Sequence, residues 1–269
     1  PAPEGIDLSA NHTVSSIAAV TILTVSGVGA VILRFVARRR MPGGLAIDDY
    51  LLLASLIICL GTLVCAILSL HYGAGHHVWA LSEAELISIL KITWADTEIY
   101  ATCVALTKFS ILFFYERLFG RGFATRFCMV LAILFWLANT IILLVGCRPI
   151  SYFWDRYNSA ASVQGHCISF DYFMWMGISD TIIDALVLLL PIHNVYKINI
   201  SAKKKIGICG IFILGLFVCI AGALRGKILS LLSVSDFTWV TACSLMYTCV
   251  EPMVGIICAC LPTYAIFFR

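Results

Sequence analysis

Charged residues are scarce in this chain. Only 12% of its 269 residues are Asp, Glu, Lys or Arg, whereas 61% are hydrophobic and the mean hydropathy is +0.98. Ordinary soluble domains carry about 25% charged residues. A soluble fold of this length would lack the polar side chains that normally cover a protein surface. The composition therefore argues against a soluble protein and indicates one that is embedded in lipid.

Other features are also missing. No run of basic residues is interleaved with aromatic residues, so a nucleic-acid partner is not expected. The chain has no internal repeat, no low-complexity segment and no long linker, which favours a single domain. Ten of its 12 cysteines lie within apolar stretches. There cysteine behaves as a small hydrophobic residue, and a disulfide scaffold is not indicated.

What the sequence does contain is seven apolar stretches, each long enough to cross a hydrocarbon core of about 30 Å as a helix. They cover residues 14–36, 50–70, 86–119, 127–146, 170–195, 206–232 and 238–268. Backbone groups in lipid must form their hydrogen bonds within the segment, so all seven are expected to be helices. The predicted fold is an all-α, polytopic bundle of seven transmembrane helices over residues 14–269, preceded by an external segment of residues 1–13.

The basic residues predict the orientation of this bundle. Eleven Lys and Arg residues fall in connections on one side and two on the other: Arg38, Arg39, Arg40, Arg117, Arg121, Arg126, Lys197, Lys203, Lys204, Lys205 and Arg269, against Arg148 and Arg156. Cytoplasmic connections of membrane proteins are enriched in Lys and Arg. The amino terminus is therefore expected outside and the carboxyl terminus in the cytoplasm.

Two features of the predicted outer side agree with this orientation. Asn11 begins an Asn-His-Thr sequence, which is a glycosylation acceptor pattern used on the luminal or extracellular side. Cys147 and Cys167 flank the polar connection after the fourth stretch, where oxidation is possible. A disulfide bond between them is expected, and the alternative is a pair of reduced cysteines at helix ends.

Ionisable residues within the apolar stretches are candidates for a functional site. Each costs about 2.5–3.5 kcal/mol to insert in a membrane and normally faces the bundle interior. Seven of them lie between the middle of the membrane and its outer side: Lys91, Asp96, Glu98, Asp180, Asp184, Arg225 and Glu251. Asp180 and Asp184 share one helix face, and Lys91 and Glu98 share another. Both faces are expected to point inward around a water-accessible cavity; the alternative is a set of salt bridges that only fix the packing.

No metal or organic cofactor is expected. His71, His76 and His77 lie together in an outer connection, but no histidine lies near the membrane acids. A retinal Schiff base would need a lysine in the seventh stretch, which has none, and Lys108 lies in the third. Lys108 is expected to pair with a neighbouring acid or to extend toward the inner face.

Two shorter motifs lie at predicted cytoplasmic helix ends. Tyr115-Glu-Arg117 is similar to the acidic-Arg-aromatic switch of G-protein-coupled receptors, although the aromatic residue is on the other side; an ordinary helix cap explains it equally well. Asp48 and Asp49 open the second stretch, as acids favour a helix amino terminus. They could also pair with Arg34 or with the arginines at 38–40.

Several motifs together resemble the fungal rhodopsin-like membrane protein family, over nearly the whole chain. They are Arg34 before Ile47-Asp-Asp-Tyr50, Gly73-Ala-Gly-His-His77, Leu106-Thr-Lys-Phe-Ser-Ile-Leu112, Cys147-Arg-Pro149 with Trp154-Asp155, Ser179-Asp180 with Leu190-Pro191, and Glu251 with Cys258-Ala-Cys-Leu-Pro262. The resemblance implies a fungal protein of the plasma membrane or an endomembrane with a receptor-like role.

Two functions fit these observations. The first is a receptor-like protein that binds a small ligand in the outer cavity through the seven ionisable residues named above and signals to a cytoplasmic protein. The second is an intramembrane cyclase or isomerase of secondary metabolism acting on a hydrophobic substrate. Buried carboxylates can serve as general acids, and Asp180, Asp184 or Glu251 would then be the proton donor. A transporter is disfavoured because paired repeats and broken helices are missing.

Overall fold

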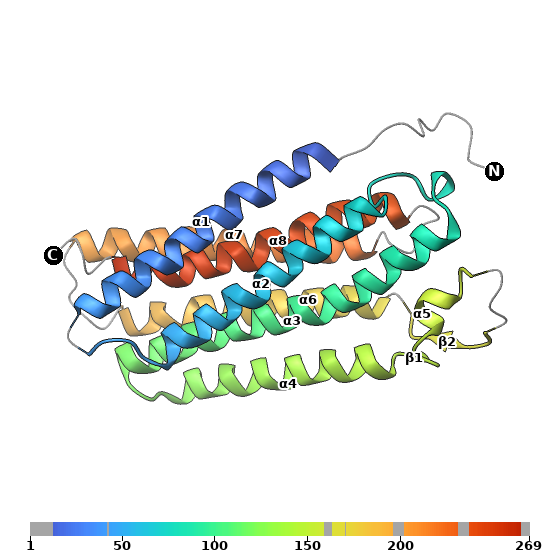
Figure 1. Ribbon diagram of the computed structural model, residues 1–269. Coiled ribbons are helices and arrows are strands. Elements are labelled where there is room, and N and C mark those ends of the chain that lie inside the picture. The colour runs from blue at the N-terminus through green and yellow to red at the C-terminus, as the bar shows by residue number, and fades with distance from the viewer. Residues whose placement is uncertain are drawn as a thin grey trace.

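The computed structural model describes residues 13–41, 43–158, 163–169, 171–195, 202–230 and 237–264. Within these residues seven long helices run side by side, each opposite in direction to the one before it (Figure 1). They are α1 (Thr13–Arg40), α2 (Ile47–His71), α3 (Glu83–Phe119), α4 (Phe123–Val145), α6 (Asp171–Val195), α7 (Ala202–Ser230) and α8 (Phe237–Tyr264). Six are long and apolar enough to cross a membrane, while the described apolar part of α7 is shorter, Phe212–Arg225. The prediction of a polytopic all-α membrane protein is confirmed.

Helices α2 and α3 begin earlier than hydropathy alone predicts because their first turns are polar. In α3 the side chain of Ser82 accepts a hydrogen bond from the backbone of Glu85, and Glu85 in turn caps the backbone of Ser82. In α2 the carboxylate of Asp49 accepts a hydrogen bond from the backbone N–H of Ala46 at 3.1 Å. Such caps satisfy the free N–H groups of the first helical turn. Apolar windows do not detect them.

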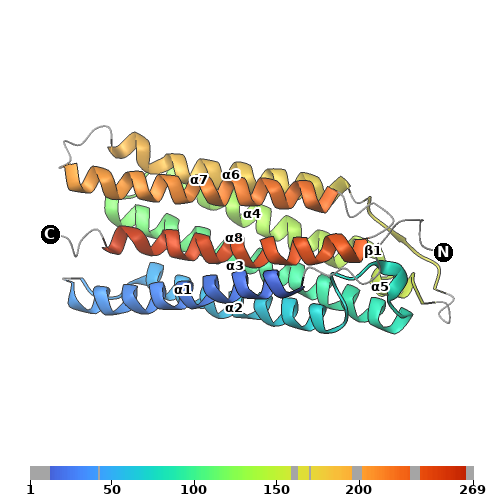
Figure 2. The ribbon, with the colours of Figure 1, turned by 90° about the horizontal axis from the view of Figure 1, so that it is seen from above.

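The seven helices form a closed ring in the order of the sequence. Each helix contacts the next, from α1 through α4 and α6 to α8, and α8 contacts α1. Across the ring, α3 contacts both α6 and α8, and α8 also contacts α2. The view from above shows α3 and α8 between the other helices (Figure 2). Side chains of α3 and α8 that point inward therefore meet in the middle of the bundle.

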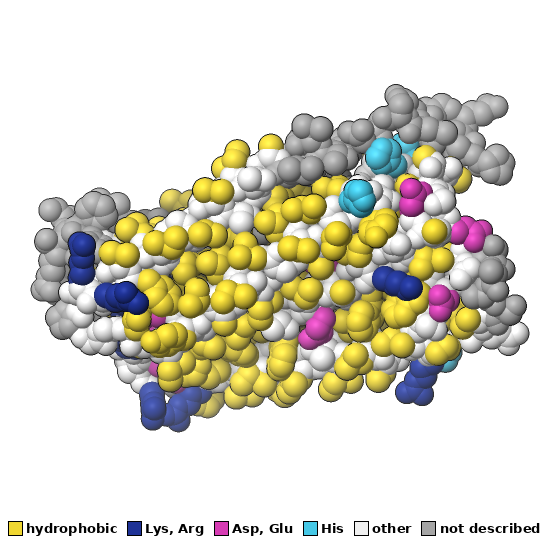
Figure 3. Space-filling model, in the orientation of Figure 1, with side chains coloured by type: hydrophobic (Ala, Val, Ile, Leu, Met, Phe, Trp, Pro, Cys, Tyr) yellow, Lys and Arg dark blue, Asp and Glu magenta, His cyan; other side chains and the backbone are white. Residues whose placement is uncertain are grey.

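The outer surface of the bundle is apolar. Figure 3 shows hydrophobic side chains over the middle of the molecule and Lys and Arg side chains gathered mainly at one end. On α4 the side chains of Phe127, Val130 and Ile141 are more than half exposed. The interior is also apolar near α2 and α8, where Leu52 and Ile256 are completely buried. A surface of this kind is stable only in contact with lipid.

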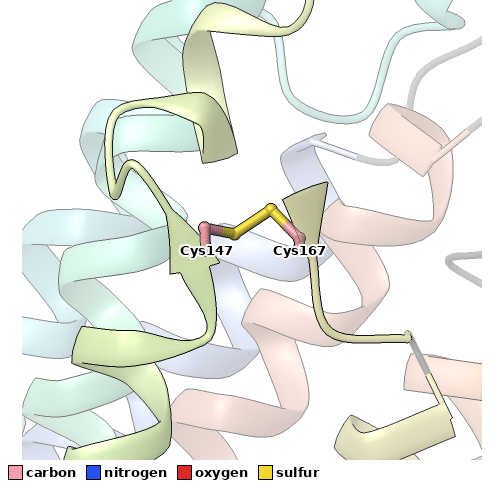
Figure 4. The surroundings of a disulfide bond; sticks show 2 residues. All are labelled: Cys147 and Cys167. Carbon is pink, nitrogen blue, oxygen red and sulfur yellow. A yellow bond between two sulfur atoms is a disulfide. The ribbon is translucent and has the colours of Figure 1, made fainter. Parts of the chain in front are cut away.

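The two ends of the bundle differ. One end, here called the disulfide end, carries the 3₁₀ turn η1 (Val78–Ala80), the short helix α5 (Tyr152–Asp155), and the strands β1 (Cys147–Arg148) and β2 (His166–Cys167). The strands pair antiparallel with Cys147 opposite Cys167, and a disulfide bond joins these residues (Figure 4). The expected disulfide is thus present. The other end, here called the arginine end, carries Arg38, Arg39 and Arg40 in the last turn of α1.

The connection between α2 and α3 is fastened to α8 at the disulfide end. The backbone N–H of Gly75 donates to the carbonyl of Thr238 at 3.2 Å, and the Thr238 hydroxyl donates to the carbonyl of His76 at 2.9 Å. The His77 ring stacks on Trp239 with 4.3 Å between ring centroids. This histidine-rich connection therefore packs against the start of α8.

Candidate functional site

Charged side chains from four helices meet in the interior of the bundle, together with the phenol of Tyr100. They form what we call the ion-pair layer: Tyr100 and Lys108 of α3, Asp180 and Asp184 of α6, Arg225 of α7 and Glu251 of α8. Asp180, Glu251 and Lys108 are each at most 4% exposed. Charges this deep are tolerated only when they are paired. The layer therefore depends on contacts among four helices.

Lys108 holds the α6 side of the layer. Its ammonium group forms a short ion pair with Asp180 and lies 3.2 Å from the carboxylate of Asp184. The four-residue spacing that predicted a shared face for the two acids thus brings both to one lysine. Of the two alternatives expected for Lys108, pairing with an acid or extending toward the inner face, the structure shows the first. Lys108 was not among the predicted ligand-binding residues.

Arg225 and Tyr100 hold the α8 side of the layer. Nε of Arg225 lies 3.1 Å from Oε2 of Glu251, and the phenol of Tyr100 donates to Oε1 of the same carboxylate at 2.7 Å. The guanidinium carbon of Arg225 lies 4.2 Å from the centroid of the Tyr100 ring, which is a cation–π contact. Arg225 also approaches Asp180 at 4.0 Å, so the two sides of the layer are connected.

The three acids of the layer have the donor set of a metal site, but protein cations already contact them. Carboxylate oxygens of Asp180, Asp184 and Glu251 lie within 4.8 Å of one another. Lys108 contacts the first two acids, and Arg225 contacts the third. A metal ion would have to displace these cations or bind among them. We therefore assign no metal to the cluster.

A cavity of about 120 Å³ adjoins the ion-pair layer on its disulfide side and is called here the main cavity. Asp96, Tyr100, Lys108, Asp180 and Arg225 contribute polar groups to its wall. Aromatic side chains supply much of the rest: Trp94, Phe135, Trp136 and Phe153. Ligand sites in proteins commonly combine an apolar wall with a few charged or polar groups. The main cavity has this composition.

Two smaller cavities lie beyond the main cavity in opposite directions. A cavity of about 50 Å³ shares Trp94 and Phe153 with it and reaches the disulfide between Cys147 and Cys167. A cavity of about 70 Å³ lies toward the arginine end and is lined by Asp184, Glu251 and Lys108 among others. Lys108 lines both this cavity and the main one. The ion-pair layer thus separates the two halves of the bundle.

Of the seven predicted ligand-binding residues, the structure brings Asp96, Asp180 and Arg225 into the wall of the main cavity. Asp184 and Glu251 line the cavity on the opposite side of the ion-pair layer. The predicted set is therefore divided between two cavities. Sequence spacing indicates which residues share a helix face, but it does not indicate which cavity that face adjoins.

Lys91 and Glu98 lie outside the three cavities, so the expected inward orientation of their shared face needs correction. The Lys91 ammonium is exposed and lies 5.8 Å from the centroid of the Trp154 ring of α5. Oε1 of Glu98 accepts a hydrogen bond from the hydroxyl of Thr140 of α4 at 2.8 Å. Their face of α3 packs against α4 and α5. A threonine on α4 can partner a carboxylate that sequence analysis places in the interior.

A second buried charge cluster joins three helices near the arginine end. Nη2 of Arg34 lies 2.6 Å from Asp48, and its Nε lies 2.7 Å from Asp49. Nη1 of Arg34 donates to the carbonyl of Ala259 in α8 at 2.5 Å. Arg38 contacts both acids at 3.3 and 3.4 Å, so pairing of these acids with the α1 arginines, one of the alternatives considered, is observed. The cluster ties α1 and α2 to α8.

The Tyr115–Arg117 motif lies beside this cluster. Nη1 of Arg117 approaches Asp48 at 3.5 Å, and its Nη2 lies 3.4 Å from the carbonyls of Gly43 and Gly44. Tyr115 is buried among the rings of Phe114 and Phe119. Arg117 therefore binds the connection between α1 and α2.

The predicted glycosylation residue, Asn11, lies outside the described residues.

The motifs that resemble the family meet in the fold: Arg34 contacts Asp48 and Asp49, and Arg225 contacts both Glu251 and Asp180. The fungal rhodopsin domain matches residues 33–269. The chain belongs to the fungal rhodopsin domain family. No solved structure matches it.

Three curated relatives resemble this fungal rhodopsin domain protein. A SAT4 family membrane protein of Emericella nidulans is 29% identical over 205 residues, which cover 74% of this chain and 51% of the relative. The polyenoic acids biosynthesis gene cluster protein Ba17b of Metarhizium anisopliae is 29% identical, covering 91% of this chain and 71% of the relative. The wortmanamides biosynthesis cluster protein C of Talaromyces wortmannii is 25% identical, covering 92% and 69%. The chain spans about half the length of the first of these relatives.

Proposed function

We propose that this chain is a receptor-like membrane protein that binds a small organic ligand in the main cavity. One observation carries the proposal: the bundle encloses an aromatic-walled space of about 120 Å³ into which buried charged side chains project. An empty apolar cavity of about 150 Å³ is enough to bind benzene in an engineered protein. The neighbouring 50 Å³ space would accommodate a longer ligand.

Ligand binding would act on the rest of the bundle through the ion-pair layer. Asp180 and Arg225 line the main cavity and also contact Lys108 and Glu251 within the layer. A ligand that competes for either side chain would weaken a contact between helices. A ligand that binds one packed state of the bundle more tightly than another shifts the equilibrium toward the state that it prefers.

The proposed orientation places all seven helices across the membrane with the amino terminus outside. The alternating helix directions and the arginines of the arginine end support this arrangement. A ligand would then enter from the disulfide end, and a cytoplasmic signalling protein would meet the arginine end near Arg117. Glycosylation of Asn11 tests the orientation: a glycan that is present in the unaltered protein and lost in Asn11→Gln would support it. Protease access to the amino terminus from the cytoplasmic side would contradict it.

Native mass spectrometry of the protein in lipid nanodiscs tests ligand binding. The protein is incubated with a small-molecule library and the bound species are identified. Ala101 lines the main cavity, whereas Ala138 is exposed on α4. Ala101→Phe should fill the space and abolish binding, and Ala138→Phe should leave it unchanged. Equal binding to both variants would refute the main cavity as the site.

A second candidate function is an intramembrane cyclase or isomerase. The names of two relatives refer to biosynthesis clusters, which favours this alternative. Asp180, Asp184 and Glu251 would supply the proton, and the cavity would hold a hydrophobic substrate. Because an isomerisation leaves the mass unchanged, the bound compound is recovered and compared by chromatography with the compound added. A new isomer that disappears in Glu251→Gln or Asp180→Asn would favour the enzyme, and unchanged ligand would favour the receptor.

A further inference from the structure

We infer that the ligand of the main cavity is an organic cation, a substituted ammonium ion held by the carboxylate of Asp96 among aromatic rings. This inference rests on the proposed ligand-binding function and specifies its chemical class. Three observations support it: the bonding of Asp96, the composition of the wall, and the balance of charge around the cavity.

Asp96 differs from the other deeply buried acids of the described residues. Its side chain is 4% exposed and lines the main cavity, yet Oδ1 has no hydrogen-bond partner among the residues that the structure describes. The remaining acids that are this deeply buried, Asp48, Asp49, Asp180 and Glu251, each contact an arginine or a lysine. Half-buried Glu98 also has an oxygen, Oε2, without a partner in the described part of the chain, but its Oε1 accepts a hydrogen bond from Thr140. A buried carboxylate oxygen without a partner is unfavourable. A positively charged ligand would supply the missing partner of Asp96.

The wall of the main cavity is suited to a cation with an organic shell. Trp94, Trp136, Phe135 and Phe153 line the cavity, together with the ring of Tyr100. Aromatic rings attract ammonium groups through their quadrupole, and such cages recognise quaternary ammonium ions. The same rings pack against the alkyl groups of the ion. A hydrated inorganic cation would gain little from this apolar wall.

The charges near the cavity also favour a cation. In their ionised forms the ion-pair layer holds three acids, Asp180, Asp184 and Glu251, against two bases, Lys108 and Arg225. Asp96 adds a fourth carboxylate without adding a base. Both bases already contact acids, so an anionic ligand would meet excess negative charge. A cation would reduce that excess.

Binding of matched charged and uncharged probes tests the inference. The probes are tetramethylammonium, choline and benzyltrimethylammonium, each compared with the isostere in which carbon replaces nitrogen. Equilibrium dialysis against nanodiscs measures saturable binding, with Ala101→Phe as the blank for uptake by lipid. At least one cation should bind at a concentration of about 10 mM or below, and more tightly than its isostere.

Two variants of α3 then test whether the carboxylate of Asp96 is the group that binds the cation. Asp96→Asn should weaken cation binding by about tenfold or more and should leave the isostere unaffected. Glu98→Gln is the matched control, because Glu98 bonds to α4 outside the cavity, and it should bind as the unaltered protein does. Equal cation binding by Asp96→Asn, or no preference for the cation over its isostere, would overturn the inference.

The two proposals fail in different ways. If isosteres bind and Ala101→Phe blocks them while the cations show no advantage, the main cavity is a ligand site and the cation inference is wrong. If no probe and no library compound binds, both proposals are wrong. Should Asp96→Asn not fold, infrared spectra of the unaltered protein decide: a protonated Asp96 in the cation-saturated protein overturns the inference.

Discussion

The phenol of Tyr100 and the carboxylate of Glu251 join α3 to α8 through a hydrogen bond of 2.7 Å. This contact lies at the point where the main cavity meets the ion-pair layer. Glu251 also contacts Arg225, which in turn packs over the Tyr100 ring. Three helices thus share one carboxylate. A substitution at Glu251 should therefore alter the contacts of the whole ion-pair layer.

Removing the Tyr100 hydroxyl should destabilise the bundle. Tyr100→Phe keeps the ring beneath Arg225 but leaves Oε1 of Glu251 without its donor. Loss of a buried hydrogen-bond partner costs about 1–3 kcal/mol. Thermal denaturation of the detergent-solubilised protein measures the effect, with Tyr50→Phe as the control because Tyr50 is 57% exposed. Equal melting temperatures for the two variants would contradict the assigned role of the hydroxyl.

Replacing Lys108 should have a larger effect. Lys108→Met removes the one ammonium group that contacts both Asp180 and Asp184. Removing one partner of a buried ion pair costs about 3–5 kcal/mol, because the other charge stays buried. Lys91→Met on the same helix is the control, since Lys91 is exposed and its ammonium group lies over the Trp154 ring. We expect the yield of folded protein to fall for Lys108→Met and not for its control.

Arg34 should not be replaceable by lysine. Its guanidinium contacts Asp48, Asp49 and the carbonyl of Ala259 through three different nitrogens. A lysine has a single ammonium group and cannot reproduce this fork. Arg34→Lys should therefore lower the melting temperature, while Arg39→Lys, at an exposed position of the same helix, should not. A stable Arg34→Lys protein would show that net charge alone satisfies the cluster.

Two glycines of α1 provide a test of the packing between α1 and α8. A Cβ atom at Gly27 would overlap the side chain of Met253, which is buried in α8, whereas a Cβ atom at Gly29 would meet no atom within 4 Å. Forcing a larger side chain into a packed interior costs about 1–3 kcal/mol. Gly27→Leu should therefore destabilise the bundle, and Gly29→Leu should be tolerated. Unfolding at increasing concentrations of a denaturing detergent distinguishes the two variants.

The sequence predicts the helices well because lipid imposes simple requirements on length and polarity. Residues 86–119 and 170–195 match α3 and α6 closely. The small elements at the disulfide end, η1, α5 and the strands, were not predicted. Their residues have no apolar run, and they are held by tertiary contacts such as the disulfide between Cys147 and Cys167.

The candidate site is harder to predict from the sequence than the helices are. Helical spacing correctly pairs Asp180 with Asp184, but it cannot tell that the face shared by Lys91 and Glu98 packs against α4 and α5. Likewise, whether Oδ1 of Asp96 finds a partner among the described residues depends on which side chains of other helices reach it. A residue's depth follows from counting along one helix, whereas its partners depend on the rotation of all the others.

Helix α8 is anchored at two levels by charged side chains of other helices. Arg225 and Tyr100 bind Glu251, and Arg34 binds the carbonyl of Ala259 about two turns further along. Because α8 is held at both Glu251 and Ala259, it cannot slide or rotate at one of these positions without straining the contact at the other. Mechanical strain that begins beside the main cavity would thus be delivered to the arginine end along the axis of a single helix.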